Sequence, residues 1–244
     1  MPVYRLHDGL VFPPPEAAED GLLAVGGDLS VERLLLAYSQ GIFPWYSEEE
    51  PPLWWSPDPR MIFYPESMYP SHRLWRTLRS GRFRMTADTA FSAVIRACAD
   101  TPRQDQNGTW ILPEMVEAYE RLHQAGFAHS IECWEADQLV GGLYGVSLGS
   151  AFFGESMFSH RTDASKAAFF TLGGLCRAWN FSLVDGQVHN PHLVRLGGRE
   201  ISRRSFLKKL GEAMAHPTRQ GPWNLRDITF PDALKPPQRT HEIP

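Results

Sequence analysis

Three strand-like runs follow one another between residues 129 and 158, with no helical pattern between them. The runs are HSIECWEA, QLVGGLYGVSL and SAFFGESMF, and short polar or glycine-containing turns separate them. Consecutive strands joined by such short turns pair as antiparallel neighbours. The pattern therefore predicts an antiparallel meander, around which the rest of the chain must fold.

Apolar residues at helical spacing surround this meander. Helices are predicted from Ser30 to Gly41, from Ser71 past Leu78, over 91–98, from Pro113 to Gly126, over about 165–179, and after Ser202. The run FSLVDGQVH, residues 181–189, adds a strand after the fifth of these helices. Helices, a meander, and then strand and helix again predict an α+β protein whose mixed sheet is covered by helices.

Six prolines between Pro51 and Pro70 interrupt the helical patterns. Each proline removes a backbone donor and disfavours helix in the residue before it, so the stretch is expected to be an extended connection. We therefore expect a small N-terminal α+β domain, residues 1–64, and a larger mixed-sheet domain, residues 65–244. The tail from about Pro231 is expected to be extended.

Charge is distributed unevenly along the chain. The net charge of −4 disfavours a nucleic-acid partner on average. Two segments, 72–85 and 194–210, nevertheless carry +5 each, which leaves −14 for the remainder. Such segregation favours an anionic partner that touches only part of the surface.

Several classes of protein are disfavoured. Cys98, Cys133 and Cys176 are far apart and form no CxxC pair, which argues against a disulfide framework or a zinc ribbon. His189 and His192 beside Asp185 lack a further ligand at a defined spacing, so no metal is expected. No GxxxxGK[ST] or GxSxG motif occurs. Without a visible signal peptide or long apolar run, we expect a soluble cytoplasmic protein with no membrane partner.

Two polar motifs are candidate sites. In VDGQVHN, an extended backbone places Asp185, Gln187 and His189 on one face, although the motif also fits a polar strand end. In FFGESMFS, Glu155 shares a strand face with Met157 between large apolar neighbours. Such a carboxylate is either functional or paired with an arginine, because burial without a partner is costly.

Aromatic residues gather in predicted loops at 43–46, 54–55 and 108–110. They fit either of two roles, stacking platforms for bases or packing at the junction between the two units.

Eight blocks together resemble the bacterial leucyl/phenylalanyl-tRNA–protein transferases. They are GLLAVGGDLS, GIFPW, WWSPDPR, GTWI, LVGGLYGV, FFGESMFS, ASKAAF and VDGQVHNPH with its downstream LGG, in order from about residue 10 to 215. The resemblance implies an acetyltransferase-like (GNAT) fold for the larger domain. It also implies transfer of Leu or Phe, with Met as a further candidate, from tRNA to proteins that begin with Arg or Lys. In the bacterial N-end rule pathway this transfer marks them for degradation, and it needs no cofactor because the ester is already activated.

The resemblance also implies roles for individual residues. Asp185 and Gln187 match the central motif, in which the aspartate polarises the glutamine, and Glu155 matches a glutamate that holds the aminoacyl end. Residues implied to bind the aminoacyl side chain are Leu143, Met157 and Phe169. Residues implied near the terminal adenosine are Trp45, Trp110 and Tyr119. Residues implied to hold the acceptor stem are Arg73, Arg76, Arg79, Arg203, Arg204 and Lys208. Arg195 departs from the family, which more usually has a small residue there.

Two alternatives stay open at this level. One is an acetyl-CoA-dependent GNAT acetyltransferase, but residues 138–143 and 195–200 both fail the last position of its [QR]xxGx[GA] loop. The other is a non-catalytic tRNA-binding module, which leaves the Asp185, Gln187 and Glu155 motifs unexplained.

Overall fold

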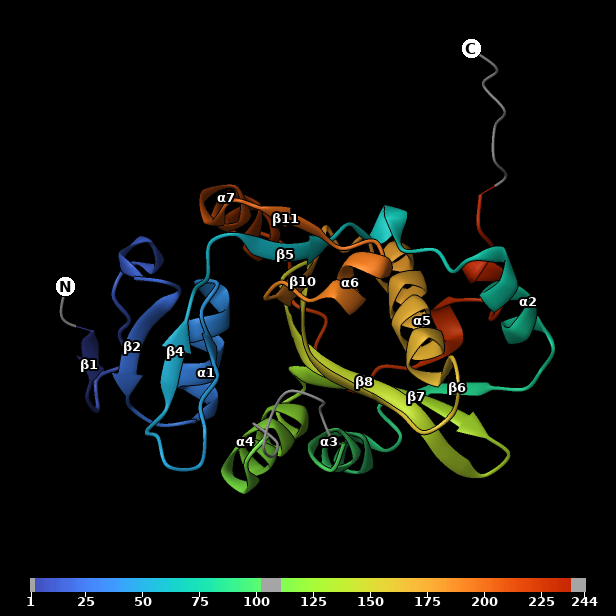
Figure 1. The fold of residues 1–244 in the computed structure, drawn as a ribbon, viewed down its shortest axis with the longest axis horizontal. Coiled ribbons are helices and arrows are strands. Elements are labelled where there is room, and N and C mark those ends of the chain that lie inside the picture. The colour runs from blue at the N-terminus through green and yellow to red at the C-terminus, as the bar shows by residue number, and fades with distance from the viewer. Residues whose placement is uncertain (1–2, 102–110, 238–244) are drawn as a thin grey trace, which may run out of the picture.

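Two sheets form the protein (Figure 1). The computed structural model describes residues 3–101 and 111–237. The smaller sheet has the order β1-β2-β4-β3. Its strands are β1 (Tyr4–Leu6), β2 (Leu22–Gly26), β3 (Phe43–Pro44) and β4 (Leu53–Trp55). These short strands fall where the sequence predicted only a small mixed unit and a proline-rich connection.

The larger sheet has seven strands in the order β11-β5-β10-β9-β8-β7-β6. They are β5 (Arg60–Phe63), β6 (Arg84–Ala87), β7 (Ala128–Glu135), β8 (Gln138–Leu148), β9 (Ala151–Ser159), β10 (Leu183–Gln187) and β11 (Arg199–Ile201). The predicted meander is confirmed as β7, β8 and β9, which pair antiparallel in sequence order. Only β9 and β10 pair parallel within this sheet. The sheet is therefore mixed, as expected.

Helices cover both faces of the larger sheet. They are α1 (Val31–Ser39), α2 (His72–Arg79), α3 (Phe91–Ala99), α4 (Pro113–Gln124), α5 (Ala164–Ala178), α6 (Pro191–Arg195) and α7 (Arg203–Met214). In Figure 1, α3 and α4 lie below the sheet and α5 lies above it. The predicted N-caps are confirmed, because the hydroxyls of Ser30, Ser71 and Ser202 each accept from a backbone N–H three residues on.

The first strand of the larger sheet precedes the predicted domain boundary. Strand β5 lies within residues 1–64, yet it pairs with β10 and β11 rather than with the smaller sheet. Residues 56–59 thus connect the two sheets, a few residues before the expected boundary at residue 64. The prolines delimit this connection, but sequence periodicity does not reveal with which sheet a four-residue strand will pair.

The C-terminal segment packs more tightly than an extended tail. Leu234 lies in a short 3₁₀ turn (Asp232–Leu234) and is fully buried against α5, where Gly174 leaves space for its side chain. Trp223 is buried as well, with its ring stacked on that of His129 at 3.9 Å. The prediction of an extended tail from Pro231 is wrong for residues 232–234, because apolar contact with α5 holds them.

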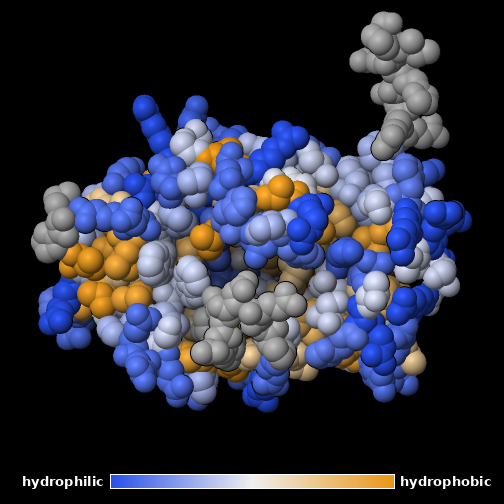
Figure 2. Space-filling view, viewed as in Figure 1, coloured by the Kyte–Doolittle hydropathy of each residue, from blue (hydrophilic) through white to orange (hydrophobic). Residues whose placement is uncertain are grey.

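Exposed apolar side chains gather at the end of the molecule that carries β1 and β2, as Figure 2 shows. They include Val3, Tyr4, Leu10 and Val11.

Among the helices of residues 3–101 and 111–237, none is both long enough and apolar enough to cross a membrane.

Candidate active site

A cavity of about 650 Å³ opens beside strands β8, β9 and β10. Leu143 of β8 and Met157 of β9 lie opposite each other in the antiparallel register, and both line the cavity. Phe169 of α5 lines it as well, with its ring edge-on to Phe63 at 4.9 Å. The three residues that the resemblance assigned to one apolar pocket therefore do lie in one cavity.

The polar wall of the cavity comes from the middle of β9 and the end of β10. Asp185 and Gln187 of β10 and Glu155 of β9 all line it. The two candidate motifs thus lie side by side in one cavity. These strands pair in parallel, which brings their polar residues to the same end of the sheet.

Asp185 forms a buried ion pair with an arginine that the sequence analysis did not single out. Arg60 donates from Nε to Oδ1 at 2.9 Å and from Nη2 to Oδ2 at 2.6 Å, and both side chains are almost completely buried. The guanidinium lies between the rings of Phe43 and Phe206 and donates from Nη1 to the carbonyl of Gly41. Asp185 and Arg60 thus neutralise each other in the core. In the sequence, only its place in the WWSPDPR block pointed to Arg60 as a functional residue.

Gly41 makes this arrangement possible at the end of α1. Its φ is +74°, and a Cβ at this position would lie only 2.7 Å from the ring of Phe206. A glycine here both ends the helix and lets the backbone carbonyl approach Arg60.

Gln187 contacts both carboxyl groups, through different atoms. Its backbone N–H donates to Asp185 Oδ1, and its side-chain Nε2 donates to Glu155 Oε1, each at 2.8 Å. The residue has a φ of +62°, and the strand register shifts between Asp185 and Gln187. A left-handed backbone therefore directs this side chain towards Glu155, and strand periodicity does not predict such a backbone. The resemblance implied that Asp185 polarises the side-chain amide of Gln187. In the structure, Asp185 contacts only the backbone N–H of Gln187, and the side-chain amide bonds to Glu155 instead.

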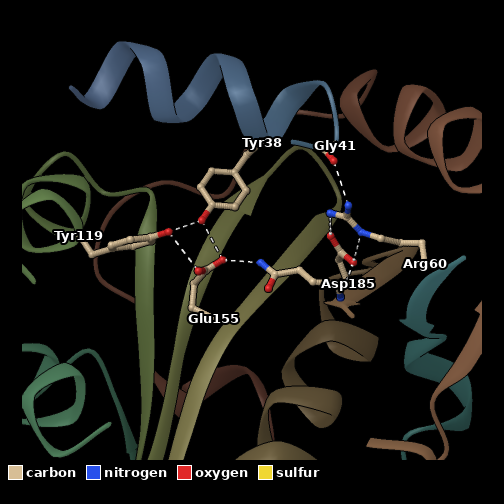
Figure 3. Close-up of polar contacts among 7 residues, drawn as sticks. Tyr38, Gly41, Arg60, Tyr119, Glu155 and Asp185 are labelled. Atoms are coloured by element: carbon tan, nitrogen blue, oxygen red, sulfur yellow. Dashed lines mark hydrogen bonds and ion pairs between the residues drawn. The ribbon is translucent and has the colours of Figure 1, made fainter. Parts of the chain in front are cut away.

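Glu155 has no arginine partner among the described residues. It forms hydrogen bonds with Tyr38 at 2.8 Å, with Tyr119 at 3.0 Å and with Gln187 (Figure 3). Burial raises its pKa to about 7, although these hydrogen bonds act in the opposite direction. Within residues 3–101 and 111–237, the ion pair with an arginine therefore belongs to Asp185 and not to Glu155.

The two tyrosines form the back of the site. Tyr38 and Tyr119 are fully buried and hydrogen-bond to each other as well as to Glu155. Burial raises the pKa of both phenols well above the usual value. The ring of Tyr119 also packs edge-on against that of Tyr144, with ring centroids 5.6 Å apart. Tyr38 was missed because its helical spacing is that of a core residue.

The aromatic clusters lie in two different settings. Trp54 is fully buried and packs edge-on against Phe12, which fits packing within the smaller sheet. Trp45 is half-buried and lines the cavity, and its carbonyl accepts from Trp55 Nε1. Trp110 lies outside the described residues.

The basic residues lie in different settings. Arg73, Arg76 and Arg79 are exposed on α2, and Arg204 and Lys208 are exposed on α7. Arg203 instead donates to the carbonyls of Ser56 and Glu16 and so ties α7 to the N-terminal part. Arg195 is exposed at the end of α6.

His189 lies beyond the end of β10. Its Nδ1 is 3.1 Å from a carboxylate oxygen of Glu200, and its ring also reaches the cavity. The expectation that the strand continues to residue 189 is wrong, because β10 ends at Gln187. Within the described residues, no group of three His, Cys, Asp or Glu side chains could hold a metal ion.

Comparison with known proteins identifies the family of this chain. Residues 62–211 match the family described as "Leucyl/phenylalanyl-tRNA protein transferase", and residues 27–58 match the N-terminal domain of the same family. A solved structure of L-PGS from Bacillus licheniformis matches over 66% of this chain and 51% of its own chain. The sequence identity is 10% and the TM-score is 0.38.

Curated relatives match almost the whole chain. The leucyl/phenylalanyl-tRNA–protein transferase of Anaeromyxobacter sp. (strain Fw109-5) is 58% identical over 92% of this chain and 96% of its own. The enzyme of the same name from Desulfatibacillum aliphaticivorans is 56% identical over 92% and 97%. That from Oleidesulfovibrio alaskensis is 49% identical over 98% and 97%. The chain belongs to the leucyl/phenylalanyl-tRNA–protein transferase family.

Proposed function

We propose that this protein transfers leucine or phenylalanine from aminoacyl-tRNA to the N-terminal α-amino group of proteins that begin with Arg or Lys. The observation that carries the proposal is the single cavity in which an apolar pocket meets Glu155, Asp185 and Gln187. Family membership disfavours the two alternatives, a CoA-dependent acetyltransferase and a non-catalytic tRNA-binding module. Action in the cytoplasm, within the N-end rule pathway, is part of the proposal.

The reaction needs orientation more than activation. The amine nitrogen attacks the ester carbonyl carbon, the bond to the ribose oxygen breaks, and that oxygen ends with the proton from the amine. We assign the aminoacyl side chain to Leu143, Met157 and Phe169. A pocket of this kind separates homologues by only about 1–3 kcal/mol per methylene, which suits an enzyme that accepts both Leu and Phe.

Gln187 is placed to hold the attacking amine. Its Nε2 is committed to Glu155, so its carbonyl oxygen is the atom available to accept an amine N–H. An amide is too weak a base to remove the proton fully, so Gln187 orients the nitrogen lone pair towards the ester. Asp185 acts by fixing the backbone of Gln187, and the ion pair with Arg60 holds that carboxylate in place.

The larger sheet also supports a proposal about fold class. The parallel neighbours β9 and β10 are connected through α5 inside an otherwise antiparallel sheet. We assign this arrangement to the GNAT-like type implied by the family resemblance.

A peptide assay tests the function. Protein mixed with leucyl-tRNA and a peptide beginning with Arg is expected to yield the leucylated peptide without ATP or added metal. The matched control is the same peptide with an acetylated N-terminus, which has no free amine. Absence of transfer, or equal transfer to both peptides, contradicts the proposal.

The exposed cations of α7 are proposed to contact tRNA phosphates. Replacing Arg204 and Lys208 together by alanine is expected to weaken tRNA binding and to reduce the slope of log K against log salt by about 1–2, because two phosphate contacts are lost. Arg203 is left intact because it holds the fold together.

The control for this experiment is a double change of Arg96 and Arg121 to alanine. Both are exposed arginines, on α3 and α4, which lie away from α7 in Figure 1. The salt slope should not change in this variant. An unchanged slope in the α7 variant would place the tRNA on another surface.

A further inference from the structure

Three side chains from three elements close into a ring of hydrogen bonds behind the cavity. Tyr38 of α1, Tyr119 of α4 and Glu155 of β9 converge there, as Figure 3 shows. Tyr38 Oη contacts Glu155 Oε1 at 2.8 Å, and Tyr119 Oη contacts Oε2 at 3.0 Å. The two hydroxyls also hydrogen-bond to each other. Each of the three groups is therefore bonded to both of the others.

The number of protons decides which form of Glu155 fits this ring. Each tyrosine hydroxyl has one hydrogen to donate. If both hydroxyls donate to an ionised Glu155, neither has a hydrogen left for the contact between the tyrosines. Three hydrogen bonds would then share two protons.

A protonated carboxyl group supplies the missing hydrogen. Glu155 Oε2–H then donates to Tyr119, Tyr119 donates to Tyr38, and Tyr38 donates to Glu155 Oε1. Gln187 Nε2 donates to the second lone pair of Oε1. Each of these four hydrogen bonds then has its own donor hydrogen.

The surroundings of Glu155 favour the same form. The carboxyl group is buried, and among residues 3–101 and 111–237 no cation forms an ion pair with it. Burial raises its pKa to about 7, and the nearby charge of Asp185 acts in the same direction. The titratable or charged groups around it are Tyr38 of α1, Tyr119 of α4, Tyr144 of β8 behind Tyr119, and Asp185 of β10 with its partner Arg60 of β5.

We propose that the resting protein holds Glu155 as a neutral carboxylic acid, with Tyr38 and Tyr119 as positioning residues that close the ring around it. The proposal has a chemical consequence that rests on the proposed function. A carboxylate in the cavity would stabilise the ammonium form of the incoming amine, which cannot attack an ester. A neutral acid does not favour that form, so the amine enters more readily as the nucleophilic free base.

Infrared spectroscopy tests the protonation state directly. In mildly acidic buffer, the protein is expected to show the carbonyl stretching band of a protonated carboxyl group. This band should be absent from Glu155→Gln and should disappear from the native protein as the pH rises through about 7. No such Glu155-dependent band in mildly acidic buffer would overturn the proposal.

The positioning role of the two tyrosines is tested by the pH midpoint at which Glu155 loses its proton. Removing either hydroxyl, by Tyr38→Phe or Tyr119→Phe, changes the hydrogen bonds of Glu155 and should shift the midpoint by roughly one pH unit. The matched control is Tyr46→Phe, whose hydroxyl donates to the different carboxylate of Glu114, and it should leave the midpoint in place. A midpoint that neither ring variant moves would overturn the positioning role.

Stability gives a second readout that does not depend on the tyrosine variants. An amide can replace a neutral acid in this ring, so Glu155→Gln should be about as stable as the native protein in mild acid. As the pH rises from the usual range of glutamate to about 7, the native protein should lose stability relative to this variant, because the folded state holds a proton that the unfolded chain releases. A large loss of stability for Glu155→Gln in mild acid would overturn the proposal. Neither readout needs tRNA, so a failure of the ring and a failure of the transfer function are distinguishable.

Discussion

Replacing Asp185 by asparagine is expected to lower the free energy of unfolding by about 3–5 kcal/mol, because the change removes one partner of a buried ion pair. Arg60 stays buried between two aromatic rings, with no carboxylate to balance its charge. Chemical denaturation followed by circular dichroism measures the loss.

The control for this variant is an arginine–carboxylate pair at the surface. Arg82 and Glu135 are 2.7 Å apart, and both are partly exposed to solvent. Because solvent screens such a pair, Glu135→Gln should change stability far less than Asp185→Asn. Similar effects for the two variants would show that the Arg60–Asp185 pair is not a structural anchor.

Asp185→Asn should also slow transfer at a temperature where it stays folded. The carboxylate accepts from the backbone N–H of Gln187 and so fixes the residue that orients the amine. The turnover number is expected to fall far more than the affinity for tRNA, and the two are measured by single-turnover transfer and by filter binding. An equal loss in both would indicate a role in tRNA binding.

Replacing Gln187 by alanine is expected to lower the turnover number by about 10²–10³, the range observed when a preorganised polar contact to a transition state is removed. The contact with the amine forms fully only as the nitrogen attacks, so tRNA affinity should change little. The two constants are separated by varying tRNA and peptide concentrations independently.

Two further variants check this interpretation. Gln187→Asn keeps a residue that tolerates the left-handed backbone at φ +62° but shortens its reach by one methylene, and it should also lose most of the activity. Gln138→Ala changes an exposed glutamine at the start of β8 and should leave transfer unaffected. Full activity in Gln187→Ala would remove this residue from the mechanism.

Local features of the fold are predictable from the sequence because short-range chemistry decides them. The caps at Ser30, Ser71 and Ser202 depend on residues three positions away, and the meander depends on strands joined by tight turns. The short strands β5 and β11 were not predicted. A three- or four-residue strand carries too little pattern of its own, and its pairing partner lies far away along the chain.

The candidate site also combines features that the local sequence decides with features that only the folded chain decides. The sequence by itself determined the family, the charged segments and the motifs that contain Asp185, Gln187 and Glu155. The tertiary structure alone decided their partners: Arg60 for Asp185, and Tyr38 with Tyr119 for Glu155. These contacts join residues 36 to 125 positions apart. The protonation of a buried carboxyl group depends on burial and on the donors around it, and only the folded chain brings those together.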